Sequence, residues 1–329
     1  MSPPDAVSVL EACYAVDLAE DARWLQGVVT ALRGTIAGAG GIVSYLYASP
    51  RGEQLLPSTF VFDGNVGPAN ETMMRGLLTS LPAALLKKVL DVPFLRGRDV
   101  EFPGHNVVWA GLRLAGIADN LVFNGRDPSG YGCFAGVAVA HRPKVTKRQA
   151  QMFAQLAAHM ASGYRLRRRL RTADNATDNA TEAIVTPQGL VTHAESPAQA
   201  KTARQALAHA AKSLERARGK LRRDDPERAV DEWRGLIAAR WTLIEQFESD
   251  GKRFLVAKRN DPPIASIESL TPRELQAVGF ASLGHANKLI AYEMGISAST
   301  VGVLLGRAAK RIGVRTRHEL IQAYLRVQK

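Results

Sequence analysis

The pattern of hydrophobic and polar positions divides the first half of the chain into alternating helices and strands. Apolar residues from Trp24 to Leu32 recur at helical spacing, and a glycine-rich break then leads into residues 42–47, an apolar run typical of a strand. Residues 118–123 and 133–140 are two further strand-like runs, and the turn between them is rich in Gly, Asp and Pro. The pattern predicts a hairpin within a sheet that is surrounded by helices.

A long helix is predicted to follow this sheet. Thr146 and Gln149 have the spacing of a capping box, in which each side chain bonds to the backbone N–H of the other residue. Apolar residues then recur at helical spacing as far as Met160, and residues 165–171 are rich in arginine. Because cations are favoured at a helix C-terminus, we interpret these arginines as a solvated helix end rather than a phosphate contact.

Residues 171–181 are predicted to be a linker. They contain almost no large apolar side chain and repeat Asn-Ala-Thr twice. The linker separates a first domain, residues 1–170, from a small unit at residues 182–261.

The small unit is predicted to consist of two helices between two hairpins. Pro187-Gln188-Gly189 is the turn of the first hairpin, because proline presets φ at the first turn position. The helices are predicted over residues 198–222 and 226–240, with Pro226 in the first turn of the second, where its missing N–H costs nothing.

The second hairpin of this unit is predicted around Asp250-Gly251, a strong signal for a two-residue turn. That turn would place Phe247 opposite Phe254 and Glu248 opposite Arg253.

The net charge favours an anionic partner. The 329 residues include 43 Lys and Arg against 31 Asp and Glu, a formal charge of +12. Per residue the last segment is the most basic, because residues 262–329 hold 9 basic and 4 acidic side chains. Nucleic acid and a membrane surface are the usual partners of so basic a chain.

Cysteine usage and the N-terminal sequence indicate a cytoplasmic protein. Cys13 and Cys133 are far apart, so there is no disulfide framework and no cysteine zinc site. The N-terminus is acidic rather than basic, unlike a signal peptide, and no uncharged stretch reaches the ~20 apolar residues that span a bilayer. We therefore expect no membrane partner.

No enzymatic chemistry is indicated. The chain has no G-x-x-x-x-G-K-[ST], G-x-G-x-x-G, G-x-S-x-G or H-E-x-x-H motif. His105, His141 and His159 are scattered, without the spacing of metal ligands. We expect no catalytic residue, no metal and no cofactor.

Helix start and stop signals are dense near the C-terminus. Thr271-Pro272-Arg273-Glu274 combines an N-cap, a proline at the first helical position and the glutamate of a capping box, and it predicts a helix to residue 283. Glycines end the next two predicted helices, 287–294 and 297–312, and Thr316 with Glu319 caps a fourth. The inner apolar face is expected to comprise Leu289, Ile290, Val301, Leu305, Ala308 and Ile312. Four short helices with a tight turn between the second and third predict a tetrahelical helix-turn-helix.

These residues resemble a known family. The segments LTPRELQAV, GHANKLIAYEMGISASTV and RIGVRTRHELI are similar to the DNA-binding domain of LuxR/NarL-type bacterial transcription regulators. The resemblance covers residues 266–329 and implies that the third helix lies in the DNA major groove, with a homodimer on double-stranded DNA.

The resemblance also implies site residues. Those expected to approach DNA are Lys288, Ser297, Ser299, Thr300, Val303, Arg307, Lys310, Arg315 and Arg317. The last helix is expected to supply the dimer contact through Leu320, Ile321 and Tyr324.

Gly302 and Gly306 depart from the family pattern, in which these groove-facing positions are usually basic or polar; Leu304 stands where histidine is usual. Neither glycine can provide the bidentate base contact that is worth ~1–3 kcal/mol of discrimination. Two interpretations stay open. The glycines allow a close approach of the helix to DNA, or they form a docking face for another protein.

The first two units have weaker resemblances, carried by layout alone. Residues 1–170 are similar to a GAF-type sensory domain, and residues 182–261 to a reduced PAS-like unit. Five aromatic residues of the first domain could line a ligand pocket or simply form core: Trp24, Tyr45, Tyr47, Trp109 and Phe123.

We therefore predict an α+β protein with a GAF-like sensory domain, a small PAS-like α/β unit and a C-terminal all-α tetrahelical helix-turn-helix. The predicted function is bacterial transcription regulation, with an unknown small-molecule or protein signal at the N-terminal domain. The alternative is a signalling or anti-activator protein whose C-terminal bundle docks another regulator.

Overall fold

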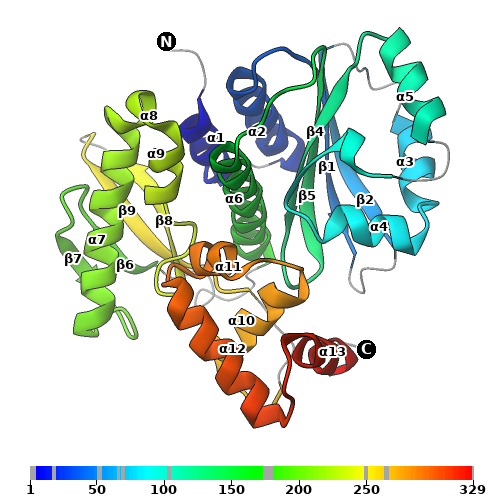
Figure 1. Cartoon of the computed structure of the whole chain (residues 1–329). Helices are drawn as coiled ribbons and strands as arrows, with labels where there is room; N and C mark the ends of the chain where they lie inside the picture. The colour runs from blue at the N-terminus through cyan, green and yellow to red at the C-terminus, as the bar shows by residue number, and fades with distance from the viewer. Residues whose placement is uncertain are drawn as a thin grey trace. The chain divides into compact units, whose positions relative to one another are not determined.

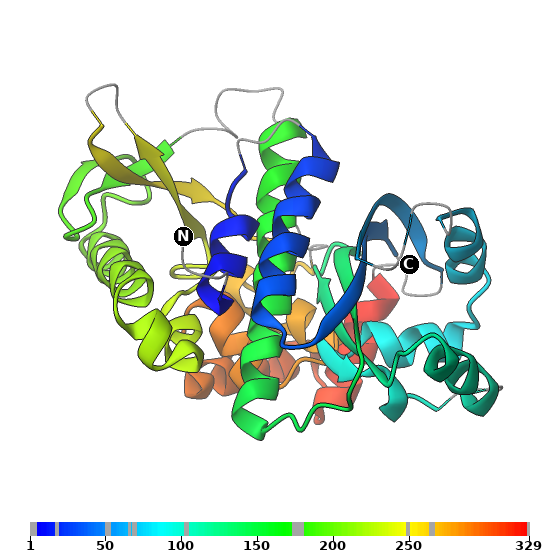
Figure 2. The same ribbon diagram turned by 90° about the horizontal axis from the view of Figure 1, so that it is seen from above.

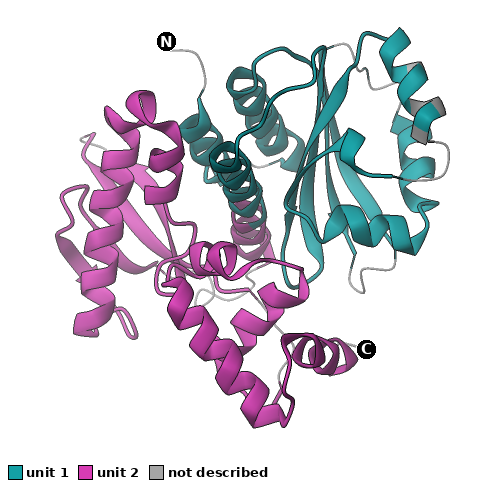
Figure 3. Cartoon of the chain, viewed as in Figure 1, with its two compact units in different colours: residues 1–161 teal, residues 162–329 magenta. Residues whose placement is uncertain are grey.

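The computed structural model describes residues 5–16, 20–49, 54–64, 67, 71–101, 105–172, 181–247, 251–262 and 267–327. It divides into two compact units, residues 1–161 and 162–329 (Figure 3). The division falls within one long helix, α6 (Lys147–Thr172).

Unit 1 is built on a five-stranded antiparallel sheet with the strand order β2-β1-β5-β4-β3 (Figure 1). Its elements are α1 (Ala6–Cys13), α2 (Asp21–Thr35), β1 (Ala39–Ala48), β2 (Leu56–Gly64), α3 (Glu71–Thr79), α4 (Ala83–Leu90), β3 (Phe94–Arg96), α5 (His105–Leu114), β4 (Asp119–Arg126) and β5 (Tyr131–Val139), followed by α6. The predicted hairpin is β4–β5, which pairs from Asp119↔Val139 to Arg126↔Gly132. The predicted capping box of α6 is also present, with Thr146 N–H to Gln149 Oε1 at 3.0 Å and Gln149 N–H to Thr146 Oγ1 at 3.1 Å.

Helices cover both faces of this sheet (Figures 1 and 2). On one face, Phe153 of α6 packs against Phe94 and Phe123, with ring centroids 4.9 and 5.5 Å away. The close approach requires Gly125, where a Cβ would lie 2.3 Å from the Ala157 carbonyl oxygen. On the other face, Tyr45 and side chains of α3 and α4 form a separate core cluster.

The aromatic residues considered for a pocket therefore do not converge. Tyr45 and Tyr47 point to the α3/α4 face, whereas Phe123 contacts α6. The Tyr47 hydroxyl donates to Asn124 Oδ1 at 2.7 Å, and all five aromatics are buried. These rings are core side chains of two different layers.

Unit 2 begins with the end of α6 and contains a four-stranded antiparallel sheet with the order β7-β6-β9-β8. The elements after α6 are β6 (Thr181–Val185), β7 (Val191–Ala194), α7 (Lys201–Arg218), α8 (Leu221–Asp224), α9 (Pro226–Glu232), β8 (Trp241–Phe247) and β9 (Arg253–Arg259). Both hairpins are present. Of the predicted linker, Arg171 and Thr172 end α6 and Thr181 begins β6, while residues 173–180 lie outside the described residues.

The prediction of a solvated arginine end for α6 is wrong. Arg165 and Arg167 are buried, with 6% and 1% of their surfaces exposed. Arg165 Nε–H donates to the Asn260 carbonyl at 2.7 Å, and Asn260 Nδ2 donates to the Ser162 carbonyl at 3.0 Å. The chain after β9 covers this part of the helix, and a helical pattern carries no information about such a neighbour.

The second predicted helix of the small unit is too long. It ends at Glu232, and residues 233–240 form a loop in which Ala238 and Ala239 have positive φ, 48° and 56°. Left-handed alanine is unfavourable, so surrounding contacts must hold this loop in place.

The predicted register of the second hairpin is wrong by one residue. Phe247 pairs with Arg253, and Gln246 pairs with Phe254. Glu248 and Asp250 lie outside the described residues. The inner parts of both strands are buried on both faces, so there was no alternation of polar and apolar residues from which to determine the register.

The C-terminal helices are α10 (Pro272–Ser282), α11 (Asn287–Met294), α12 (Ala298–Ile312) and α13 (Arg317–Val327). Each predicted cap is present: Thr271 and Glu274 bond reciprocally, Gly295 and Gly313 are left-handed C-caps, and Ser297 accepts from the Thr300 N–H. Thr316 and Glu319 form the last capping box. No single helix of the described chain is long and apolar enough to cross a membrane; α11 and α12 pass that test only as a pair bent by 102°.

Candidate nucleic-acid interface

Helices α10 to α13 share one apolar core. Ile290, Val301, Leu305 and Ala308 are buried in it as predicted, while Leu289 and Ile312 are half-buried. An ion pair between an exposed arginine and a buried carboxylate ties α10 to α12, since Arg311 Nη1 lies 3.0 Å from Glu274 Oε2, whose residue is only 2% exposed. The same carboxylate accepts the Thr271 N–H, so the N-terminus of α10 is fixed to the end of α12.

The turn between α11 and α12 is fixed by a glycine and a serine. Gly295 has φ 63°, the left-handed geometry that favours glycine. Ser297 Oγ then accepts the Thr300 N–H at 3.1 Å and lies 2.8 Å from the Ser299 hydroxyl. The Ser297 side chain is therefore occupied as the helix cap.

The outward face of α12 is exposed and carries no long side chain at its centre. Ser299, Thr300, Gly302, Gly306 and Arg307 are all exposed. Exposed Val303 and Lys310 extend this face, the former with 51% of its surface accessible. A Cβ at either glycine would meet nothing within 4 Å, so neither glycine is required by packing within the described chain.

Four of the basic side chains that were expected to approach DNA are exposed on this domain. Lys288 at the start of α11, Arg307 and Lys310 on α12, and Arg315 before α13 are exposed. These are long cations of the kind that contact DNA phosphates.

Arg317, also expected to approach DNA, is exposed and makes hydrogen bonds within the domain. Its guanidinium donates to Asn287 Oδ1 at 2.6 Å and to the His285 carbonyl at 2.5 Å. Partial burial lowers the pKa of Arg317 from its usual value. Arg317 thus joins the start of α13 to the start of α11.

The residues expected at a dimer contact are mostly internal. Leu320 and Tyr324 are 1% and 0% exposed and belong to the domain's own core, and Ile321 is half-buried. A contact through α13 would have to use its outward residues, such as Gln322 and Arg326.

The face of the helical domain near α11 packs against the loop 233–240, a contact that sequence reasoning missed. The Ala239 N–H donates to the Met294 carbonyl at 2.8 Å. The Ala239 carbonyl accepts a hydrogen bond from Gln276 Nε2, on α10, at 3.0 Å. These two bonds hold the left-handed alanine loop. The contact was missed because residues 233–240 were predicted to be part of a helix, not a loop.

Two further contacts join the helical domain to the small unit. We call this boundary, where residues 230–240 contact α10 and α11, the seam. The Tyr292 hydroxyl lies 2.6 Å from the Val230 carbonyl and 2.9 Å from the Trp233 carbonyl. The backbone of Gly295 approaches Leu236 so closely that a Cβ would lie 2.0 Å from its carbonyl oxygen. The helical domain is therefore packed firmly onto the small unit rather than tethered to it.

The described residues contain no group of three or more His, Cys, Asp or Glu side chains that could hold a metal ion. The side chain of His105 lies outside the described part. His159 is buried and its Nδ1 lies 2.8 Å from the Tyr14 hydroxyl.

Four capped helices with a glycine-stopped turn between the second and third define a helix-turn-helix domain of the DNA-binding type. Residues 268–324 match the family described as "Bacterial regulatory proteins, luxR family". The C-terminal domain is thus a LuxR-family domain, as predicted. The family consists of regulatory proteins, in agreement with the prediction of a regulator rather than an enzyme.

One curated relative matches the C-terminal part of the chain, and one solved structure aligns with most of its length. The HTH-type transcriptional activator RamA of Corynebacterium glutamicum is 38% identical over 64 residues, which are 20% of this chain and 23% of RamA. The matched segment thus spans about a quarter of that relative. The crystal structure of Escherichia coli SdiA aligns over 95% of this chain and 93% of its own, with a TM-score of 0.33 and 10% identity, values too low to support an argument about the whole chain.

Proposed function

We propose that the protein is a bacterial transcription regulator that binds double-stranded DNA through the outward face of α12. The observation that carries the proposal is that a LuxR-family domain presents this face exposed, flanked by Lys288, Arg307, Lys310 and Arg315. Ser299 and Thr300 are the polar side chains closest to the N-terminal end of α12, the part of a recognition helix that contacts base edges.

Phosphate contacts are expected to dominate the affinity, because Gly302 and Gly306 offer no side chain for base recognition. A dimer with four cations per subunit would give a slope of log affinity against log salt no steeper than about −7. The glycines would let the helix backbone approach the bases closely.

We further propose that the regulator acts as a homodimer in the cytoplasm, with unit 1 as its sensor of a small-molecule or protein signal. The strand order β2-β1-β5-β4-β3 with helices on both faces supports a GAF-like sensor, and the small four-stranded unit supports a PAS-like relay. The exposed residues of α13 are the candidates for the dimer contact.

Selection of bound fragments from a genomic library by the purified full chain tests the DNA-binding proposal. We expect a preferred sequence with two-fold symmetry, and Arg307→Ala should weaken binding about tenfold if one charged contact worth ~1.4 kcal/mol is lost. Arg223→Ala is the matched control, because Arg223 is an exposed arginine on α8. Equal losses in the two variants, or no selected sequence, would contradict the proposal.

A further inference from the structure

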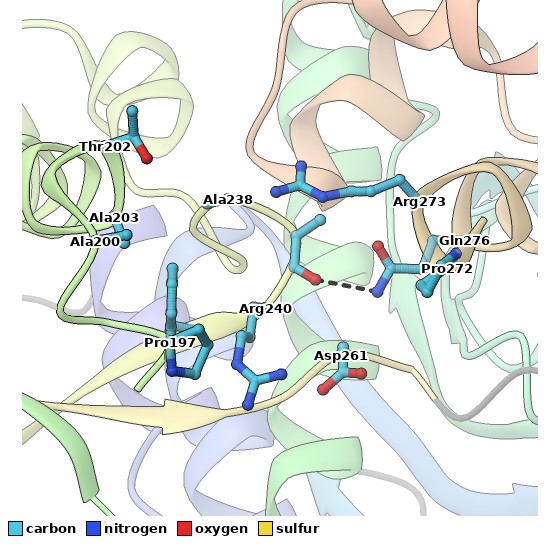
Figure 4. Close-up of a pocket in the computed structure, with 12 residues that line it drawn as sticks. Pro197, Ala200, Thr202, Ala203, Ala238, Arg240, Asp261, Pro272, Arg273 and Gln276 are labelled. Atoms are coloured by element: carbon cyan, nitrogen blue, oxygen red, sulfur yellow. Dashed lines mark hydrogen bonds between the residues drawn. The ribbon is translucent and has the colours of Figure 1, made fainter. Parts of the chain in front are cut away.

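A cleft of about 410 Å³ lies at the seam between the small unit and the helix-turn-helix domain (Figure 4). One wall is apolar and consists of Pro197, Ala200 and Ala203 with the loop residue Ala238. The opposite wall is the first turns of α10, which contribute Arg273 and Gln276. The volume falls within the range of small-molecule sites.

Arg273 is a cation without a counter-charge. Among the described residues it has no hydrogen bond, ion pair or ring contact, and it lines a partly enclosed space. Partial burial in the cleft lowers the pKa of Arg273 from its usual value, although the residue as a whole stays exposed to solvent and accessible to a ligand.

Gln276 supplies an acceptor without a donor. Its residue is 7% exposed, and its Nε2 is committed to the Ala239 carbonyl, the bond drawn in Figure 4. This bond fixes the amide, and Oε1 is left buried with no hydrogen-bond partner in the described chain. Buried polar atoms of this kind are rare and call for an unseen partner.

The remaining charges around the cleft are matched. Arg240 Nε donates to Glu182 Oε2 at 2.8 Å, and the Trp241 indole donates to the same carboxylate at 2.6 Å. Arg259 Nε donates to Asp261 Oδ1 at 2.7 Å. One cation and one acceptor, both on α10, are thus left for a ligand that also contacts the apolar wall.

We propose that this cleft binds a small 2-hydroxy or 2-amino acid. Its carboxylate pairs with the Arg273 guanidinium, and its hydroxyl or amino group donates to Gln276 Oε1. The short carbon chain lies against Ala200, Ala203 and Ala238. Because the two walls belong to the small unit and to α10, the bound acid strengthens the attachment of the helix-turn-helix domain; this consequence for DNA binding rests on the proposed function, whereas the binding itself does not.

The test uses the purified full chain and four acids: lactate, malate, serine and glutamate. Isothermal calorimetry and thermal unfolding are recorded with each acid, and with lactamide, the uncharged amide of lactate. We expect at least one acid to bind with a Kd below about 1 mM, an affinity reachable for a ligand of this size, and lactamide to have no effect. Binding of none of the four acids, or binding of lactamide as tight as that of the tightest-binding acid, would overturn the proposal.

Two variants separate the site from a general effect of charge. Arg273→Gln should weaken binding at least tenfold, and Gln276→Met should weaken it while keeping the side-chain volume. Arg223→Gln is the matched control and should bind as the unmodified chain does. Equal affinity in Arg273→Gln and Arg223→Gln would refute the assignment, even if an acid binds elsewhere.

A mobility-shift assay with and without the acid that binds then addresses regulation separately. Loss of acid binding in Arg273→Gln with retained DNA binding separates the two proposals. Absence of DNA binding with an intact calorimetric signal would overturn the proposed function and leave the acid site standing.

Discussion

Two faces of the helix-turn-helix domain differ in what they contact. On the α11 side, Tyr292 and Gly295 pack against the backbone of the small unit. The Ala239 carbonyl accepts a hydrogen bond from Gln276, and the Ala239 N–H donates one to the Met294 carbonyl. On the α12 side, a Cβ added at Gly302 or Gly306 would meet nothing within 4 Å in the described chain, and Ser299, Val303 and Arg307 are exposed. The same kind of residue, glycine, is therefore required by close contact on one face and unconstrained by the fold on the other.

The largest expected effect is at the packed face. Gly295→Ala would place a Cβ 2.0 Å from the Leu236 carbonyl oxygen in a residue with φ 63°. A left-handed alanine and an overpacked contact together cost about 2 to 5 kcal/mol of unfolding free energy, measured by urea denaturation.

Gly313→Ala is the matched control for this substitution. Gly313 has φ 81° but open space around its Cβ position, so only the backbone cost of about 1–2 kcal/mol applies. Equal losses at the two positions would mean that the Leu236 contact is unimportant in solution.

The opposite result is expected at the exposed face. Gly302→Ala combined with Gly306→Ala should raise the unfolding free energy by about 1.6 to 2 kcal/mol, because glycine is less favourable than alanine within a helix by about 0.8–1 kcal/mol. Urea denaturation measures the gain, and a mobility shift measures DNA affinity in the same variant.

The double variant also separates the two interpretations of the glycine pair. Retained or improved DNA affinity would favour binding of α12 in the DNA groove with enough room for two added methyl groups. Loss of capture of another regulator, with DNA affinity unchanged, would favour a docking face instead. A loss of stability would contradict the open geometry of both glycines.

A smaller effect is expected from Tyr292→Phe. The hydroxyl is the donor to the Val230 and Trp233 carbonyls, and a typical hydrogen bond contributes about 0.5–1.5 kcal/mol to stability. Thermal unfolding should show a lowered Tm. Tyr45→Phe serves as the control, because Tyr45 is a buried residue whose hydroxyl makes no hydrogen bond to any described residue. An unchanged Tm in Tyr292→Phe would show that the contact between the helical domain and the small unit is open in solution.

The smallest expected effect concerns fully packed side chains of unit 1. Burial raises the pKa of the Cys13 thiol and that of the Cys133 thiol well above the usual value, so neither forms a thiolate at about pH 8. Ellman's reagent should not react with the native chain and should detect both cysteines after denaturation in guanidinium chloride. Rapid reaction of the native protein would mean that this core opens readily.

The C-terminal domain was the most predictable part because its signals are local. Thr271, Ser297 and Thr316 cap helices through bonds to residues three positions away, and Gly295 and Gly313 end helices through their own backbone geometry. Such short-range chemistry is contained in a few consecutive residues, so the sequence alone was enough.

The seam was unpredictable because it depends on residues far apart in the chain. The loop 233–240 leaves the helical pattern to bond with Gln276 and Met294, and Arg165 is buried by Asn260. The role of Arg317 as a link to Asn287 has the same origin. Each involves a partner at least 30 residues away, which no local pattern encodes.

The acceptors that the small unit supplies at the seam are main-chain carbonyls, those of Val230, Trp233 and Ala239. Replacing the side chains at these three positions does not remove the oxygens, so a substitution that leaves the backbone in place keeps the hydrogen bonds to the helical domain. Loss of the attachment would instead arise from changes in the donors, Tyr292 and Gln276, or from an insertion that shifts the loop. Substitutions in the small unit that leave its backbone in place therefore do not release the helix-turn-helix domain.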